Sequence, residues 1–244
     1  MKDGVSLRSG DGRVTSDGRG LRLESLAAVD AGIYQCRAQG HQDSALGTAL
    51  VMLGDTLPML KYRFIEQSLQ PGPAVSLKCV AQGTPTPAVS WLLDGFPLQH
   101  SPRLVVGQFV NMEGDVISHV NISSVSVRDG GLYRCTAANS VGNTRHQARL
   151  NVYGVPMVRP MGEVTAVAGE QFIITCPVGG WPINMIQWQK GGKKLPLSRR
   201  QTVSVNGSLV INNVQRAIDE GDYSCTASAR HSHTSTQPVT IRVL

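Results

Sequence analysis

A seven-residue pattern that occurs three times constrains this chain more than any other feature of its sequence. The segments 30–36, 129–135 and 219–225 all read Asp-x-Gly-x-Tyr-x-Cys. Four fixed positions repeated three times do not arise by chance, and such a repeat indicates a series of similar folding units. A chain of 244 residues has room for two to three units of about 100 residues each.

Short apolar alternations precede each copy of the pattern. Each copy has apolar residues at positions i, i+2 and i+5, and these are Leu21, Leu23 and Leu26; Val120, Ile122 and Val125; and Leu209, Ile211 and Val214. Alternation with a period of two predicts a strand that has one face buried. The chain also has 26 Gly and 13 Pro, and only 16% of its residues are charged. This composition favours short strands joined by turns, so the sequence predicts an all-β fold.

An arginine precedes each of these strands. It is Arg13 in the first copy, Arg103 in the second, and Arg199 or Arg200 in the third. Because the same order of Arg, strand and Asp recurs, we expect each arginine to pair with the aspartate of its own repeat. The expected pairs in the last two copies are Arg103 with Asp129, and Arg199 or Arg200 with Asp219.

The second and third repeats share a further spacing upstream. Cys79 and Cys176 are each followed twelve residues later by a tryptophan, which is Trp91 or Trp188. A cysteine, then a tryptophan, then Tyr-x-Cys is the order found in the immunoglobulin fold, in which two sheets are joined by a disulfide on which the tryptophan packs. The sequence therefore predicts the bridges Cys79–Cys135 and Cys176–Cys225, and a tyrosine corner at Tyr34, Tyr133 and Tyr223.

The first repeat is incomplete. It has the tyrosine corner and a last strand near Leu46 to Leu53, but it has no tryptophan and no partner for Cys36. We therefore expect tandem I-set-like immunoglobulin sandwiches, one partial at residues 1–53 and two complete at residues 57–153 and 155–244. We expect Cys36 to be a reactive free thiol in a segment that is not stable alone, since fewer than about 60 residues bury little apolar surface.

The predicted bridges indicate an oxidising compartment, because disulfides persist in secreted proteins and are rare in the cytosol. Two sequons, Asn121-Ile-Ser123 and Asn206-Gly-Ser208, also favour the secretory pathway, and we expect both asparagines to carry glycan. Intracellular immunoglobulin domains of the muscle type, with reduced cysteines, are the alternative. The sequence shows neither a signal peptide nor an apolar run long enough to cross a membrane, so we expect an extracellular fragment of a longer parent.

The sequence offers no catalytic motif. It has no Gly-x-Ser-x-Gly elbow, no phosphate-binding glycine loop and no His-Glu-x-x-His segment, so neither an enzyme nor a cofactor is expected. His231 and His233 form a His-x-His pair that could hold a metal, but a tetrahedral site needs further ligands. A solvated hairpin loop is the simpler interpretation.

The formal net charge of +6 is spread along the chain except at one stretch, and nucleic-acid binding is not expected. The basic residues of that stretch, a possible contact for a glycosaminoglycan or phospholipid, are Lys190, Lys193, Lys194, Arg199 and Arg200. An exposed turn between strands is the alternative. Trp181 is expected in a loop at the end of its domain, where it either packs against the preceding domain or anchors a partner.

Several longer segments resemble the Down syndrome cell adhesion molecule (Dscam) family. The most specific segments are Ser76-Leu-Lys-Cys79, Leu93-Asp-Gly-Phe-Pro97, GDVISHVNIS at 114–123, Asn151-Val-Tyr-Gly154 and LPLSRR at 195–200. The resemblance covers nearly the whole chain. It corresponds to the end of the family's fourth immunoglobulin domain followed by its fifth and sixth.

The resemblance implies a part of a neuronal receptor whose ectodomain binds an identical copy on another membrane, in axon guidance and self-avoidance. A secreted arthropod immune recognition protein built from the same domains is the alternative. The family's signal peptide, fibronectin domains and membrane span have no counterpart here. The self-binding surfaces of the insect members are on the second, third and seventh domains, which would make this segment mostly a spacer.

Overall fold

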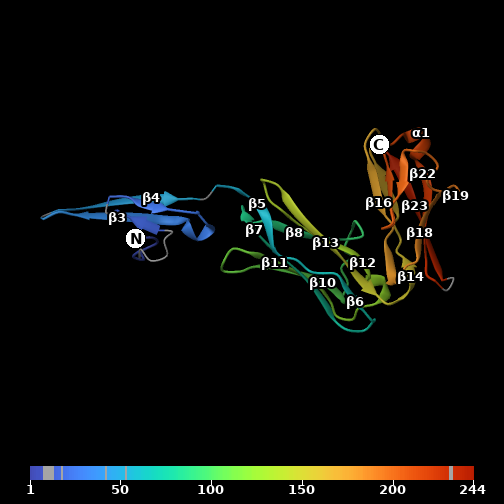
Figure 1. The fold of residues 1–244 in the computed structure, drawn as a ribbon, viewed down its shortest axis with the longest axis horizontal. Coiled ribbons are helices and arrows are strands. Elements are labelled where there is room, and N and C mark those ends of the chain that lie inside the picture. Colours follow the sequence, from blue (N-terminus) through green and yellow to red (C-terminus); the bar gives the residue numbers. More distant parts are fainter. Residues whose placement is uncertain (8–13, 18, 42, 53, 231–232) are drawn as a thin grey trace. The chain divides into compact units, whose positions relative to one another are not determined.

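A computed structural model describes residues 1–7, 14–17, 19–41, 43–52, 54–230 and 233–244. The chain divides into two compact units, Met1–Thr56 and Leu57–Leu244. Strands dominate both units, and Figure 1 shows that the second unit contains two separate two-layered bodies. The described helical segments are two 3-10 turns and one four-residue α-helix: η1 (Ala28–Asp30), η2 (Val127–Asp129) and α1 (Arg216–Asp219).

The first unit contains two small antiparallel sheets. One pairs β1 (Val14–Ser16) with β2 (Leu21–Leu23), and the other pairs β3 (Gly32–Gln39) with β4 (Ser44–Val51). The hydroxyl of Tyr34 donates to the carbonyl oxygen of Asp30 at 2.9 Å, which is the tyrosine corner. Arg13 and Leu53, for which the sequence suggested roles, lie outside the described residues.

The first body of the second unit is a sandwich of two sheets. One sheet has the order β10-β11-β7-β5 and is built from β5 (Thr56–Tyr62), β7 (Val75–Thr84), β10 (Leu104–Val110) and β11 (Val116–Ile122). The other has the order β6-β13-β12-β8-β9 and is built from β6 (Gln67–Leu69), β8 (Ala88–Leu93), β9 (Phe96–Pro97), β12 (Gly131–Ala138) and β13 (Asn143–Val152). The pairing of β6 with β13 is parallel, whereas the other described pairings in this body are antiparallel.

The core of this first sandwich follows the alternation in the sequence. Every second residue of β11 and β12 is buried, and β7 buries Leu77, Cys79 and Ala81 on the same face, so the two sheets face each other across a largely apolar core. A disulfide joins Cys79 and Cys135 across the sheets, with a Cα–Cα distance of 6.7 Å. Trp91 is buried beside it, and its indole N–H donates to the hydroxyl oxygen of Ser118 at 2.9 Å.

The second sandwich has the same plan. Its larger sheet, of order β15-β23-β22-β18-β19, contains β15 (Glu163–Ala166), β18 (Met185–Lys190), β19 (Lys193–Lys194), β22 (Gly221–Ser228) and β23 (Thr234–Val243). The smaller sheets contain β14 (Gly154–Val158) paired with β17 (Val178–Trp181), and β16 (Phe172–Thr175), β21 (Ser208–Ile211) and β20 (Gln201–Val203) in that order. As in the first sandwich, one pairing, β15 with β23, is parallel.

The core of the second sandwich repeats the bridge and the tryptophan. Cys176 and Cys225 are joined with a Cα–Cα distance of 6.1 Å, and Trp188 is completely buried. Its indole N–H donates to the carbonyl oxygen of Gly207 at 2.9 Å. The expectation of a loop at Trp181 was wrong, because this residue ends strand β17 and lies opposite Gly154 of β14.

Candidate functional site at the domain junction

The two predicted arginine–aspartate pairs are present and confirm the reading of the repeat. Arg103 donates two hydrogen bonds to Asp129, with N–O distances of 2.6 and 2.9 Å. Arg200, rather than Arg199, forms the equivalent pair with Asp219 at 2.7 and 3.2 Å. Each aspartate ends the helical turn before a tyrosine corner, so the pair links that turn to the residue just before β10 or β20.

The electrostatics of these pairs follow from their burial and their partners. Burial acts to raise the pKa of Asp129, but the Arg103 guanidinium and the hydroxyl and amide of Ser126 lower it below the ordinary value for aspartate. The same competition, with Arg200 and the Gln215 amide as partners, lowers the pKa of Asp219. Both carboxylates are therefore ionised at neutral pH and hold their arginines.

A third arginine–aspartate pair links the two sandwiches, and the repeat pattern did not predict it. Arg159, just after β14, belongs to the second sandwich, and it forms an ion pair with Asp94 of the first. The same guanidinium donates to the carbonyl oxygens of Arg128 and Gly130, both at 2.7 Å. The other oxygen of Asp94 accepts the backbone N–H of Leu132 at 2.8 Å. Arg159 thus contacts three groups of the first sandwich, and Asp94 in turn contacts a fourth, the backbone of Leu132.

The local sequence explains why Asp94 can reach this position. Asp94 and Gly95 form the two-residue turn between β8 and β9, and both have positive φ, at 51° and 88°. Asp-Gly is a favoured pair for such hairpin turns, because both residues tolerate the left-handed region. The turn buries Asp94, whose side chain is 1% exposed, and places Phe96 against the core of the second sandwich.

Close backbone contact also joins the two sandwiches. Strand β17 packs against η2, and a Cβ atom on Gly179 would overlap the carbonyl oxygen of Val127. A Cβ atom on Gly154 would overlap the side chain of Val127 as well. The glycines at these two positions therefore permit an approach that no other residue type would allow.

A groove lies beside this junction, within the second unit. Its volume is ≈ 780 Å³, and both sandwiches contribute to its walls. The first sandwich supplies Arg134 and Arg145 from the outer face of β12 and β13, whereas the second supplies Ile173 and Thr175 from β16. Asp94 also lines the groove, but it is engaged by Arg159. The groove therefore has a cationic wall and an uncharged, largely apolar wall.

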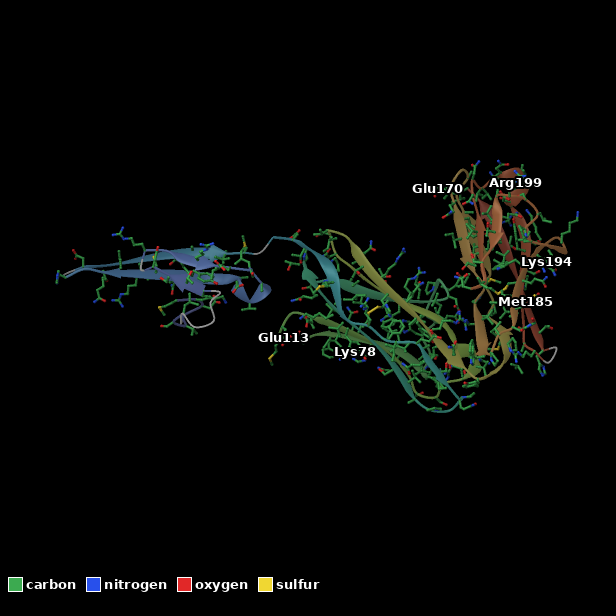
Figure 2. All side chains as sticks on the ribbon, in the orientation of Figure 1. Lys78, Glu113, Glu170, Met185, Lys194 and Arg199 are labelled. Atoms are coloured by element: carbon green, nitrogen blue, oxygen red, sulfur yellow. A yellow bond between two sulfur atoms is a disulfide. The ribbon has the colours of Figure 1, made fainter. Side chains whose placement is uncertain are left out.

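The basic residues that are close together in the sequence have different surroundings in the structure. The ammonium group of Lys190 donates to the carbonyl oxygens of Ile218 and Glu220, and Arg200 is committed to Asp219. The other three, Lys193, Lys194 and Arg199, are exposed, and Figure 2 shows Lys194 and Arg199 at the surface of the second sandwich. Two of the five residues thus have structural partners, which reduces the charge available to a polyanion.

The two sequon asparagines are both exposed. Asn121 lies on the outer face of β11, where its side-chain oxygen accepts a hydrogen bond from the Ser76 hydroxyl at 2.7 Å. Asn206 is in the turn before β21, and its side-chain oxygen accepts the backbone N–H of Ser208 at 3.1 Å. Both positions leave room for a glycan outside the core.

Three further sequence expectations concern a free thiol, a metal site and a membrane span. Cys36 is exposed and makes no disulfide with any described residue. His231 lies outside the described residues, and within the described ranges no group of three His, Cys, Asp or Glu side chains gathers as a metal site. No described helix is long and apolar enough to span a membrane.

Comparison with known proteins places this geometry in a family. The immunoglobulin I-set domain profile matches residues 58–152 and 155–243. Cell adhesion molecule Dscam2 of Drosophila melanogaster is 48% identical over 246 aligned residues, which cover 100% of this chain and 12% of the relative. Cell adhesion molecule Dscam1 of the same organism is 44% identical over 226 residues, covering 92% of this chain and 11% of the relative. The chain thus spans about an eighth of the length of these relatives.

A solved structure shows the same similarity in three dimensions. The crystal structure of the N-terminal eight immunoglobulin domains of Down syndrome cell adhesion molecule matches with a TM-score of 0.74 and 41% sequence identity. The match covers 100% of this chain and 31% of that chain. The similarity therefore extends over all of the described units.

Proposed function

Because this chain belongs to the immunoglobulin I-set family and its domains are of the Dscam type, we propose that it is an extracellular segment of an adhesion receptor that binds other proteins, including copies of itself. The single observation that carries this proposal is the identity of 48% to a cell adhesion molecule over the whole chain. The chain covers only 12% of that relative, so the partner, the location on the cell surface and the homophilic mode belong to the proposal.

Within such a receptor, we assign the second unit the role of a fixed connector between flanking domains. Arg159 makes an ion pair and two hydrogen bonds to backbone carbonyls across the junction, and Gly179 allows the two backbones to touch. Interfaces between domains of one chain are usually small and permit motion unless specific contacts restrain them. Restraint here would keep distant binding surfaces in the relative positions that self-binding needs.

The proposal also includes the domain bounds, glycans and location that the sequence predicted. We propose complete domains at 57–153 and 155–244 and a partial one at 1–53, glycans on Asn121 and Asn206, and an extracellular location of the parent protein. Exposure of both asparagines supports the glycans, and the two bridges are consistent with an oxidising compartment.

Cell aggregation tests the proposed function directly. Cells that do not otherwise adhere would express the full parent receptor, either unchanged or with Arg159→Ala. We expect the unchanged receptor to aggregate the cells and the variant to reduce aggregation several-fold at equal surface expression, because the connector loses its restraint. The matched control is Arg199→Ala, which removes an exposed arginine from the same domain.

Two results would contradict this assignment. Failure of the unchanged receptor to aggregate cells would remove the adhesive function itself. Normal aggregation by the Arg159→Ala receptor would retain adhesion but remove the connector role.

A further inference from the structure

We propose that the groove beside the domain junction binds an extended polypeptide segment in which acidic and apolar residues alternate. This inference concerns a partner other than the self-binding surfaces, so it goes beyond the proposed function. It depends on the charge of one wall, the apolar character of the other and the space between them.

The cationic wall, Arg134 and Arg145, has no carboxylate in ion-pair contact among the described residues. Arg134 lies opposite Gln147 in the register of β12 and β13, so the outward-facing Arg145 and Arg149 are its diagonal neighbours. None of these three arginines forms an ion pair with a described residue. Five other arginines of this unit, Arg103, Arg159, Arg200, Arg216 and Arg242, do have carboxylate partners.

The side chain of Arg134 is restrained by hydrogen bonds. Its Nε and one Nη donate to the side-chain oxygen of Gln147 at 3.2 and 3.0 Å. These bonds fix the guanidinium plane and leave the other Nη group without a partner among the described residues. A guanidinium restrained in this way loses less rotational freedom when it binds a carboxylate.

The opposite wall is apolar, so a ligand that carries only charge would leave it uncovered. Ile173 is 57% exposed on the outer face of β16, although the inward neighbour Ile174 is buried. The partly buried rings of Phe96 and Phe172 also line the groove. A sulfated polysaccharide could pair with the arginines, but it has few apolar groups to cover these side chains, whereas a polypeptide can supply both.

An extended segment matches both walls at once. In a strand, successive side chains point in opposite directions, so alternating acidic and apolar residues would present carboxylates to one wall and apolar groups to the other. The groove volume of ≈ 780 Å³ is in the range of small-ligand sites, which suits a few residues of such a segment. We expect weak binding, with a Kd of about 10 to 100 µM, because few groups take part.

The test measures peptide binding to the full chain by fluorescence anisotropy. The probe is a short labelled peptide of alternating Glu and Val with blocked ends. A peptide of the same composition with all Glu before all Val tests the order, and a heparin oligosaccharide tests the charge alone. We expect the alternating peptide to bind most tightly and to weaken as salt is raised.

Two groove variants separate the walls, each with a matched control elsewhere. Arg145→Glu should weaken binding about tenfold, and Ile173→Ser about threefold to fivefold. The controls Lys194→Glu and Val205→Ser change the same kinds of exposed residue away from the groove, and they should leave binding within about twofold. All four residues are exposed, so each variant should fold, which thermal unfolding would verify.

Three outcomes would overturn the proposal. The first is no binding of the alternating peptide; the second is equal weakening by Lys194→Glu, which would show that overall charge is sufficient. The third is tighter binding of the heparin oligosaccharide together with no effect of Ile173→Ser, which would make the surface a polyanion site. Because these measurements use the isolated chain, loss of cell adhesion by the parent receptor would not affect them.

Discussion

The two units of this chain contain the same repeat, but they bury its apolar residues to different extents. In the second unit, Val120 and Leu209 are fully buried between two sheets. In the first unit, the equivalent Leu21 is 41% exposed, and Leu26 is 55% exposed where its counterparts Val125 and Val214 are buried. The tyrosine corner nevertheless has the same geometry in both units.

This difference separates local from long-range causes of structure. Tyr34, Tyr133 and Tyr223 each donate to the carbonyl of the residue four positions earlier, at 2.9, 2.8 and 2.8 Å. That bond needs only the local chain. Burial of the strand before it needs a facing sheet, which the first unit does not provide among its described strands. We therefore expect the units to respond very differently to equivalent mutations.

Loss of a disulfide should give the largest effect. Replacing Cys176 and Cys225 together by Ser should lower the free energy of unfolding of the second unit by about 4 kcal/mol, because a bridge across a loop of this length restricts the unfolded chain. Urea unfolding followed by tryptophan fluorescence would measure it. Cys36→Ser is the control and should change stability by less than about 0.5 kcal/mol, since Cys36 is exposed and unbridged. An equal effect of both changes would remove the distinction between the units.

Truncation of a repeat-equivalent leucine should give the next largest effect. Leu209→Ala should cost about 3 kcal/mol, since it leaves a cavity between the sheets. Leu21→Ala, at the same position of the first repeat, should cost less than about 0.5 kcal/mol because its side chain already contacts solvent. Paired urea titrations of the two variants would compare them. A large loss from Leu21→Ala would mean that the first unit buries this residue in solution.

The tyrosine corner should behave alike in both units. Tyr133→Phe removes one buried hydrogen bond and should cost about 1 kcal/mol in the second unit. Tyr34→Phe should accelerate amide hydrogen exchange in β3 by about fivefold, because a loss of about 1 kcal/mol changes an equilibrium constant by that factor. If only Tyr133→Phe has an effect, the corner in the first unit depends on tertiary packing and the local explanation is wrong.

Acid should remove the smallest contribution, that of the Arg103–Asp129 pair. Because the folded state lowers the pKa of Asp129, the pair stabilises the second unit above the ordinary aspartate pKa of about 3.9. This stabilisation is lost as the pH falls through the lower folded value. Asp129→Asn should therefore reduce stability by about 0.5 kcal/mol at neutral pH, and the difference from the unchanged chain should shrink as the pH falls below the ordinary aspartate pKa. A difference that is independent of pH would show that the carboxylate charge contributes nothing.

The sequence predicted those parts of the structure that recur in every repeat. The bridging cysteines, Trp91, Trp188 and the two arginine–aspartate pairs all recur in the same order around the repeated motif, because each sandwich has the same packing arrangement. The sequence did not decide whether Arg199 or Arg200 pairs with Asp219, and the structure shows that Arg200 does. Arg199 is its exposed neighbour in sequence, and spacing alone does not distinguish two adjacent residues.

The junction could not be predicted in this way, because it occurs once. The link between Asp94 and Arg159 depends on how two separately folded bodies meet, and no periodicity records that. Weak signals existed in the Asp94-Gly95 pair, which is typical of a hairpin turn, and in Gly179-Gly180, which permits close backbone contact. The groove is further removed from the sequence, since Arg145 and Ile173 belong to different domains and become neighbours of one cavity only through the junction.

The parallel strand pairs determine how each sandwich responds to mechanical force. Near the start of the first sandwich, β6 runs parallel to β13, which ends it, and β15 and β23 have the same relation in the second. Tension applied to the two ends of a domain pulls such a pair of strands in opposite directions along their length. The hydrogen bonds between the strands then carry the load together in shear, whereas a hairpin pulled open from one end breaks them one at a time. Each sandwich would thus resist pulling at the place where it begins and ends, before its core is exposed to water.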